Sequence, residues 1–187
     1  MTMTKIFKLF TERLVIRSLT RCDIDDVFDI MSDVETAHAA DFAPMESLND
    51  AEAIVRGRNN FYYSNFAICE KGSDKVIGLI QHRYVRLHGL RECEVGYLLS
   101  KDYRGKGYMT EALDAFCDLL FDCFRTVYLT ILPTNEASLG VARNVGFTYV
   151  EEDEDDKEVQ YTDLRPLDRY ELHWYTWDER HPLNEAA

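Results

Sequence analysis

The chain has 187 residues, 46% hydrophobic and 29% charged, a balance typical of a globular protein that buries its own core. Its formal net charge of −13 argues against broad binding to DNA or RNA, which requires a basic surface. No apolar run is long enough to span a membrane, and residues 1–10 lack the apolar core of a signal peptide. We therefore expect a cytoplasmic protein that binds neither nucleic acid nor a membrane.

The sequence predicts a single domain over 1–187, because it contains no internal repeat and no flexible linker. Five cysteines form no C-x-x-C pair and no cluster with histidine, so we expect reduced thiols and no metal site. The acidic run at 151–158 is typical of a solvated loop. The acidic charge itself favours a cationic substrate such as an amine, or serves solubility alone.

The first half of the chain predicts alternating strands and helices. The expected elements are a strand at 13–19, a helix from about 22 to 31, a loop over 34–48, a helix over 49–63 and strands at 66–69 and 75–85. The turn Lys71-Gly72-Ser73-Asp74 has the composition of a hairpin and joins the last two.

The second half is organised around a glycine-rich turn between a strand and a helix. The expected elements are a strand at 92–99, the turn at 103–109, a helix over 110–124, a strand at 126–132, a helix from 135 to 146 and strands at 149–151 and 169–177. Leu113, Phe116, Leu120 and Phe124 form one apolar stripe on the first of these helices. Gly146 stands where a left-handed helix end is expected.

The turn Tyr103-Arg104-Gly105-Lys106-Gly107-Tyr108-Met109 has the chemistry of an anion site. The first amides of a helix lack internal partners and carry partial positive charge, so they hold phosphates well. Gly105 and Gly107 allow close backbone approach, and Arg104 and Lys106 add positive charge. The sequence contains neither a P-loop motif nor a dinucleotide-binding G-x-G-x-x-G motif.

These residues resemble the coenzyme A pyrophosphate loop of the GNAT acetyltransferase superfamily, R-x-x-G-x-[GA]. The string from Gly105 through Tyr108, Met109 and Thr110 to Ala112 is similar to the RimJ/RimL branch, the ribosomal-protein N-terminal acetyltransferases. Met109 departs from the wider consensus, although bulky residues are familiar there in this branch. The segment 11–17 also resembles the opening of that branch, and the resemblance covers nearly the full length.

The resemblance implies an α/β (α+β) GNAT fold. Its central sheet would be mixed and mostly antiparallel, with six to seven strands and about four flanking helices. It would be splayed between two central strands, exposing backbone donors near Leu98 and Leu99 to the thioester and pantetheine. The pattern N-x-x-S would place Asn135 and Ser138 near the pantetheine arm and the thiol. Many GNAT enzymes carry a tyrosine seven residues after that asparagine as the acid for the leaving thiolate, but here the position is Ala142. Ser138 is then the side-chain candidate for that acid.

Glu94 is the first candidate to receive the proton of the amine, directly or through water, because it precedes the loop on its strand. The alternative is a strand glutamate that faces solvent or pairs with Arg91 or Arg83. Since GNAT enzymes attack directly, no catalytic cysteine is expected, and Cys93 is interpreted as a small strand residue.

Three functions fit these patterns. The first is an acetyl-CoA-dependent N-acetyltransferase acting on a protein N-terminus or a small-molecule amine. The second is an acyltransferase of the same fold with another acyl-CoA or a polyamine, amino-acid or aminoglycoside-like acceptor. The third is a CoA-binding module without turnover. We expect the acceptor pocket mainly in residues 34–63, 85–92 and 151–168, and a homodimer is compatible with the sequence.

Overall fold

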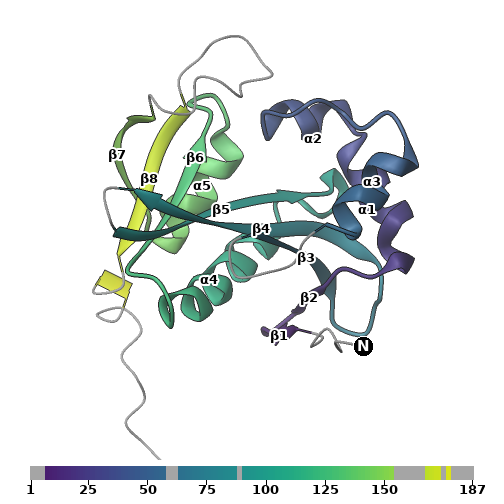
Figure 1. Ribbon diagram of the computed structural model, residues 1–187, viewed down its shortest axis with the longest axis horizontal. Helices are drawn as coiled ribbons and strands as arrows, with labels where there is room; N and C mark the ends of the chain where they lie inside the picture. Colours follow the sequence, from purple (N-terminus) through teal and green to yellow (C-terminus); the bar gives the residue numbers. More distant parts are fainter. Residues whose placement is uncertain (1–6, 58–62, 88–89, 154–166, 174–175, 178–187) are drawn as a thin grey trace, which may run out of the picture.

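The computed structural model describes residues 7–57, 63–87, 90–153, 167–173 and 176–177. Within these ranges the chain forms one eight-stranded sheet with helices on both faces (Figure 1). The strands are β1 (Lys8–Phe10), β2 (Leu14–Ser18), β3 (Tyr63–Glu70), β4 (Val76–Leu87), β5 (Leu90–Leu99), β6 (Thr126–Ile131), β7 (Thr148–Asp153) and β8 (Leu167–His173).

The order of the strands across the sheet is β1-β2-β3-β4-β5-β6-β8-β7. All neighbouring pairs are antiparallel except β5 and β6, which run parallel. The predicted mixed, mostly antiparallel sheet is therefore confirmed. It has one strand more than the upper prediction, because the three residues of β1 are too few to give a period-two pattern.

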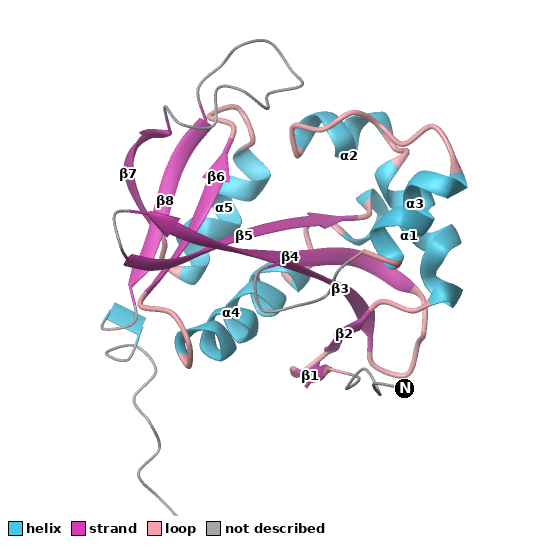
Figure 2. Ribbon diagram, viewed as in Figure 1, coloured by secondary structure: helices cyan, strands magenta, loops and turns pink. Residues whose placement is uncertain are grey.

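Five α-helices are present in the described part of the chain, together with two short 3-10 turns (Figure 2). They are α1 (Ile24–Met31), α2 (Val34–Ala39), α3 (Leu48–Val55), α4 (Tyr108–Phe121) and α5 (Glu136–Val145), with η1 (Arg21–Asp23) and η2 (Lys101–Tyr103). None of the described helices is both long and apolar enough to cross a membrane.

Two hydrophobic clusters attach these helices to opposite faces of the sheet. Leu113 and Phe116 of α4 and Val145 of α5 belong to the larger cluster, while Val27 of α1 and Ala51 of α3 belong to the smaller one. The apolar stripe predicted for α4 is confirmed for Leu113, Phe116 and Leu120, which are buried. Phe124 is also buried, but it lies beyond Phe121, where α4 ends three residues before the predicted bound. Truncating a core side chain as large as that of Phe116 to alanine costs about 3–5 kcal/mol, so α4 is firmly fixed beneath the glycine-rich turn.

The loop predicted over 34–48 is wrong in part, because α2 occupies its first six residues. Asp33 caps this helix by accepting a hydrogen bond from the Thr36 amide, an interaction that stabilises a very short helix. The helix predicted over 49–63 is also too long. It ends at Val55, just before Gly57, and Tyr63 already begins β3, while residues 58–62 lie outside the described ranges.

The last strand was predicted over 169–177 but spans Leu167–His173. Trp177 lies beyond it and packs against Phe121, with ring centroids 5.6 Å apart, while its indole N–H donates to Asp118. An alternating pattern cannot separate a strand residue from an aromatic that docks on a helix. All five cysteines are free thiols.

Candidate active site

The sheet opens between its two parallel central strands. β5 pairs with β6 only over Glu92 to Glu94, opposite Thr126 to Tyr128. Beyond that point β5 continues along β4 as far as Leu99, and β6 continues along β8 as far as Ile131. The predicted splay is therefore present, and it leaves one edge of β5 without a neighbouring strand.

Backbone groups of alternate β5 residues face this opening. The Ser100 amide donates to the Ile77 carbonyl at 2.9 Å, so the alternation along an antiparallel pair directs the Leu98 amide toward β4 as well. The backbone groups of Tyr97 and Leu99 then point to the open side. In agreement, the Leu99 carbonyl accepts a hydrogen bond from Arg104 Nε at 3.2 Å instead of from a strand. Of the predicted pair, Leu99 presents its amide to the opening.

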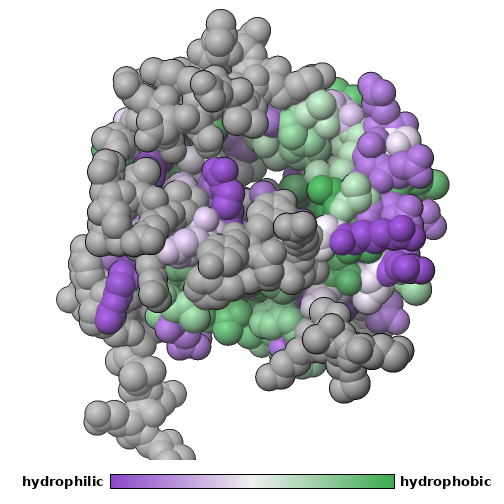
Figure 3. All heavy atoms as spheres, in the orientation of Figure 1, coloured by the Kyte–Doolittle hydropathy of each residue, from purple (hydrophilic) through white to green (hydrophobic). Residues whose placement is uncertain are grey.

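A cavity of about 1010 Å³ fills the opening and extends between α2 and α5. The predicted site residues that line it are Glu94, Leu98, Leu99, Arg104, Gly105, Gly107, Tyr108, Met109, Thr110, Asn135 and Ser138. Lys106 does not line it, because its ammonium donates to the Asp102 carbonyl and lies over the Tyr103 ring. Figure 3 shows a hollow on this side of the molecule, with hydrophobic residues near it and hydrophilic ones over the outer face of α1 and α3.

The glycine-rich turn has the backbone that a phosphate loop requires. Gly105 has φ +73° and Gly107 has φ +78°, a left-handed region that residues with a Cβ rarely adopt. Gly107 is also the N-cap of α4, which continues for fourteen residues. The unpaired first amides of a long, well-packed helix therefore lie at one end of the cavity.

Arg104 connects this turn to α2. Its Nη1 pairs with Glu35 Oε1 at 2.7 Å, and its Nη2 donates to Thr36 Oγ1 at 2.7 Å. Close by, Lys101 pairs with Asp33 at 3.1 Å. Of the two cations predicted to attract phosphate, Arg104 is thus paired with Glu35 of α2, whereas Lys106 is not.

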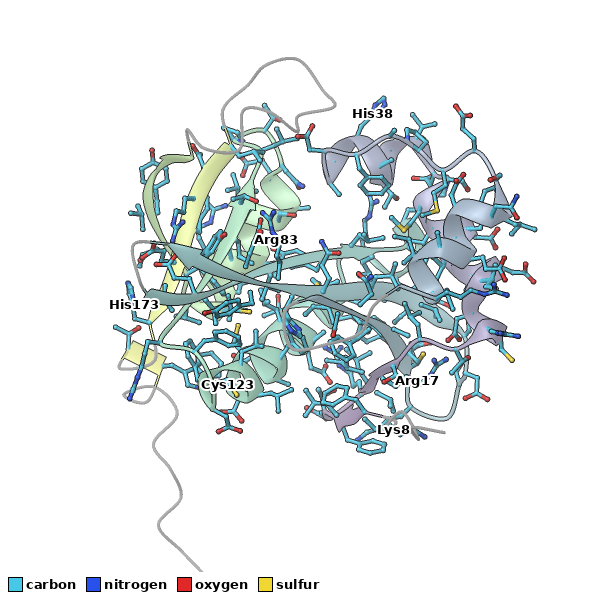
Figure 4. The ribbon with its side chains drawn as sticks, in the orientation of Figure 1. Lys8, Arg17, His38, Arg83, Cys123 and His173 are labelled. Carbon is cyan, nitrogen blue, oxygen red and sulfur yellow. The ribbon has the colours of Figure 1, made fainter. Side chains whose placement is uncertain are left out.

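Glu94 lies at the opposite end of the opening, where β5 and β6 separate. Its Oε2 accepts from Arg83 Nε at 2.6 Å, and its Oε1 accepts from Thr130 Oγ1 at 3.1 Å. Arg83 projects from β4 toward the cavity (Figure 4), and both Arg83 and Glu94 line it. The predicted pairing of Glu94 with Arg83 is therefore present, and the residue also lines the cavity, so its role as proton acceptor stays a prediction.

Asn135 links the two sides of the cavity. Its Oδ1 accepts from the Ser138 amide at 3.1 Å and so caps α5, while its Nδ2 donates to the Ala39 carbonyl of α2 at 2.7 Å. Ser138 follows on the first turn of α5 and lines the cavity. Ala142, one helical turn later, is fully buried and has no polar group to offer.

Tyr97 is a site residue that the sequence reasoning missed. Its hydroxyl donates to the Ser138 carbonyl at 3.3 Å, and the ring lines the cavity. Burial raises the pKa of the phenol, so it stays protonated at neutral pH. Strand alternation could have indicated this position, because it places Tyr97 on the face of β5 opposite to that of Glu94. This is the face that packs against α4 and α5.

Part of the predicted acceptor region also lines the cavity. Thr36, Phe42 and Ile54 contribute from 34–63, and Leu167 contributes from 151–168, of which 154–166 lie outside the described ranges. Of the predicted segment 85–92, the side chains of 85–91 lie outside what the structure describes, and Glu92 is buried and pairs with Arg169. Cys93 is fully buried, and burial raises the pKa of its thiol to about 12, which disfavours the thiolate.

The sheet thus opens beside a glycine-rich turn at the start of α4, and the Glu94 carboxylate lies where the two strands part. The model of the acetyltransferase (GNAT) domain family matches residues 13–148, and the chain belongs to this family. It is therefore an acetyltransferase by family. Enzymes of this family use acetyl-CoA as the acetyl donor.

Several relatives support this assignment. The uncharacterized N-acetyltransferase p20 of Bacillus licheniformis is 26% identical over 145 residues, which cover 74% of this chain and 81% of that protein. The ribosomal-protein-S5-alanine acetyltransferase of Vibrio fischeri shares the fold with a TM-score of 0.71 at 20% identity, covering 91% of this chain and 98% of its own. The spermidine N-acetyltransferase of Vibrio cholerae, solved with CoA and spermine, gives 0.72 at 17% identity, covering 88% and 97%.

Proposed function

We propose that this protein transfers the acetyl group of acetyl-CoA directly to a primary amine bound in the cavity between β5, β6 and α2. The observation that carries the proposal is the opening of the sheet between β5 and β6. It joins an anion-binding turn at one end to the Glu94 carboxylate at the other within a single cavity.

The donor half of the cavity fits a pyrophosphate followed by a thioester arm. The amides at Gly105, Gly107 and the first turn of α4, from Tyr108 through Met109 to Thr110, would hold the phosphates, with Arg104 beside them. Lys106 would add positive charge from outside the cavity. The pantetheine arm would contact β5 at Leu98 and at the amide of Leu99. On the other side it would contact Asn135, which caps α5, and Ser138 in the first turn of α5. Acetyl-CoA supplies the activated acyl group when bound, and no metal is needed for its transfer.

The acceptor half supplies the proton chemistry. A C–N bond forms and the C–S bond breaks. A cationic acceptor must lose two protons, one before attack to free the nitrogen lone pair and one after the C–N bond forms, and the second replaces the proton given to the leaving sulfur. Glu94 would accept the proton of the amine directly or through one water, while Arg83 and Thr130 hold its carboxylate in place. The hydroxyl of Ser138 would donate to the departing sulfur, because Ala142 has none to offer.

We infer that the acceptor is a cationic amine, either a protein N-terminus, as the RimJ/RimL resemblance suggests, or a small molecule. The net charge of −13 favours the approach of such a group. The structural neighbours from Vibrio act, by their names, on a ribosomal protein and on spermidine, so polyamines are the second class to test. Another acyl-CoA as donor is a variant of the same proposal.

The test is amine-dependent release of CoA thiol from acetyl-CoA, with N-terminal peptides and polyamines as separate acceptor panels. We expect saturable turnover with at least one panel, and a fall in kcat for Ser138→Ala and Glu94→Gln. Binding of acetyl-CoA without thiol release from any amine would contradict transfer to an amine.

A further inference from the structure

Glu111, in the first turn of α4, is held by Thr11 and Arg13, which lie just before β2 and about a hundred positions before Glu111 in the sequence. Its Oε1 accepts from the Thr11 hydroxyl at 2.5 Å and from the Arg13 amide at 2.7 Å. Its Oε2 accepts from Arg13 Nε at 2.6 Å. Four lone-pair positions thus receive three donors, two of them from one residue, which fixes the carboxylate rigidly.

The other branch of Arg13 reaches the glycine-rich turn itself. Its Nη1 donates to the Lys106 carbonyl at 2.9 Å, and its Nη2 lies 3.5 Å from where a Cβ on Gly107 would stand. Its guanidinium also stacks on the Tyr108 ring, 4.7 Å from the ring centre. On its other side Tyr108 donates its hydroxyl proton to Glu70 of β3 at 2.5 Å. Lys106 and Tyr108, the residues on either side of Gly107, are therefore held by contacts with Arg13 and Glu70.

The Lys106 contact determines where the Gly107 amide points. A trans peptide bond directs its C=O and N–H in opposite directions, and the described residues contain no cis peptide. When Arg13 draws the Lys106 carbonyl outward, the amide of Gly107 is turned away from Arg13. Gly107 lines the cavity and Lys106 does not, which agrees with this orientation.

We propose that Thr11, Arg13 and Glu111 form a clamp of positioning residues that holds the phosphate loop in its CoA-binding conformation. Gly105 and Gly107 have the widest conformational freedom of any residue type, so an unclamped turn would visit many conformations. The clamp orders the turn before the ligand binds, so binding does not have to supply the free energy of ordering. The inference rests on the proposed binding of acetyl-CoA at this loop.

The charge of Glu111 makes the clamp testable. Burial alone would raise the pKa of this carboxyl, but the bonds from Thr11 and Arg13 outweigh burial and lower the pKa, so it is ionised at neutral pH. An anion beside a phosphate site opposes phosphate binding by simple electrostatics. Removing the charge should therefore tighten binding if Glu111 acts only through its field, or if Arg13 binds phosphate directly once released. It should weaken binding if Glu111 acts through the conformation of the loop.

The experiment is titration calorimetry of acetyl-CoA with wild type, Glu111→Gln and the matched control Glu52→Gln, which breaks the Glu52–Arg56 ion pair of α3 away from the loop. We expect Glu111→Gln to raise the Kd of acetyl-CoA about tenfold, because the apparent Kd rises in proportion as the fraction of molecules with the binding-competent loop falls to about one tenth. The control should leave the Kd unchanged. At saturating acetyl-CoA the kcat of Glu111→Gln should stay within about twofold of wild type.

A truncated donor separates positioning from general damage. S-acetylpantetheine lacks the pyrophosphate, so its kcat/KM should be the same for wild type and Glu111→Gln, while that of acetyl-CoA falls. Because Arg13 is 44% exposed, loss of this ion pair should cost little global stability. Should Glu111→Gln fail to fold, Thr11→Val removes one bond of the clamp and should weaken binding, with Thr11→Ser restoring it.

Each outcome decides between the two proposals. Equal or tighter acetyl-CoA binding by Glu111→Gln, beside a wild type that binds, overturns the clamp and leaves the proposed function intact. A parallel loss with S-acetylpantetheine also overturns it, because the defect would then lie outside phosphate binding. A wild type that binds no acetyl-CoA overturns the cofactor assignment and the clamp together.

Discussion

The two walls of the cavity are built in different ways. The donor wall, formed by β5, the glycine-rich turn and α4, is fixed by a buried helix and by the contacts of Arg13, Tyr108 and Glu111. The facing wall is α2, a helix of six residues held mainly by the ion pairs of Asp33 and Glu35 and by the bond from Asn135. Glu35 is 74% exposed, so its pair with Arg104 is easily broken. The wall that carries the glycine-rich turn is therefore anchored by a buried helix, whereas the α2 wall is held in part by ion pairs at the surface.

The largest effect should come from breaking the donor wall at Gly107. Valine at φ +78° is strained by about 1–3 kcal/mol, so the turn must change its backbone. We expect Gly107→Val to show no saturable binding of acetyl-CoA at millimolar ligand in calorimetry. Gly72→Val is the matched control, since Gly72 has φ +82° with open space around it in the turn between β3 and β4. Wild-type affinity in Gly107→Val would contradict the loop assignment.

The next effect concerns chemistry instead of binding. Glu94→Gln should lower kcat at neutral pH by about 10- to 1000-fold, the usual size for loss of a general base. The affinity for acetyl-CoA should not change, because Glu94 lies where β5 and β6 separate and not at the loop. Thr130→Val, which removes one hydrogen bond but keeps the carboxylate, should have a smaller effect. If the pH–rate profile of Glu94→Gln matched that of wild type, the proton would have to pass to water or to the backbone.

A moderate effect is expected on the stability of the α2 wall. Bonds from Thr36 and from Lys101 lower the pKa of Asp33 to about 2. A carboxyl whose folded pKa is depressed contributes its charge-dependent stability in full above its unfolded pKa, and loses it as the pH falls through the folded value. Asp33→Ala should therefore cost about 1 kcal/mol near neutral pH, the usual cost of a lost N-cap.

Urea unfolding at several pH values checks this prediction. The difference in unfolding free energy between wild type and Asp33→Ala should be constant above about pH 4 and shrink toward pH 2. A difference that grows on acidification would mean that Asp33 does not act as an ionised cap.

The smallest effect is expected from Glu35→Gln. If phosphate and Glu35 compete for Arg104, removing the carboxylate should tighten acetyl-CoA binding about two- to threefold, the scale of an exposed ion pair. The gain should disappear at high salt, which screens exposed charges. Weaker binding in Glu35→Gln would instead mean that Glu35 positions Arg104 for the ligand.

Much of the donor wall could be predicted from the sequence because its signals are local. The stripe of Leu113, Phe116 and Leu120 has helical spacing, and Gly105 and Gly107 occur where a strand changes to a helix. The left-handed end at Gly146 was also predicted and has φ +97°. Each of these features is decided by residues within a few positions of one another.

The remaining features depend on contacts that no local pattern encodes. The bond from Thr11 to Glu111 joins residues 100 positions apart, and Lys106 resembles a phosphate ligand in the sequence but turns toward Asp102. The α2 helix is too short for a periodic signal, so a loop was predicted there, and the cap at Asp33 was recognised only in the structure. For Glu94 the sequence left two roles open; the structure shows the pairing with Arg83 and a position on the cavity, and the role as proton acceptor stays a prediction.

The most direct test of the account is titration calorimetry of the purified protein with acetyl-CoA, compared with CoA lacking the 3′-phosphate. We predict saturable binding of one acetyl-CoA per chain, lost in Gly107→Val and retained in Gly72→Val and Glu94→Gln. No binding by the wild type at millimolar acetyl-CoA would contradict the central claim that the opening between β5 and β6 is a coenzyme A site.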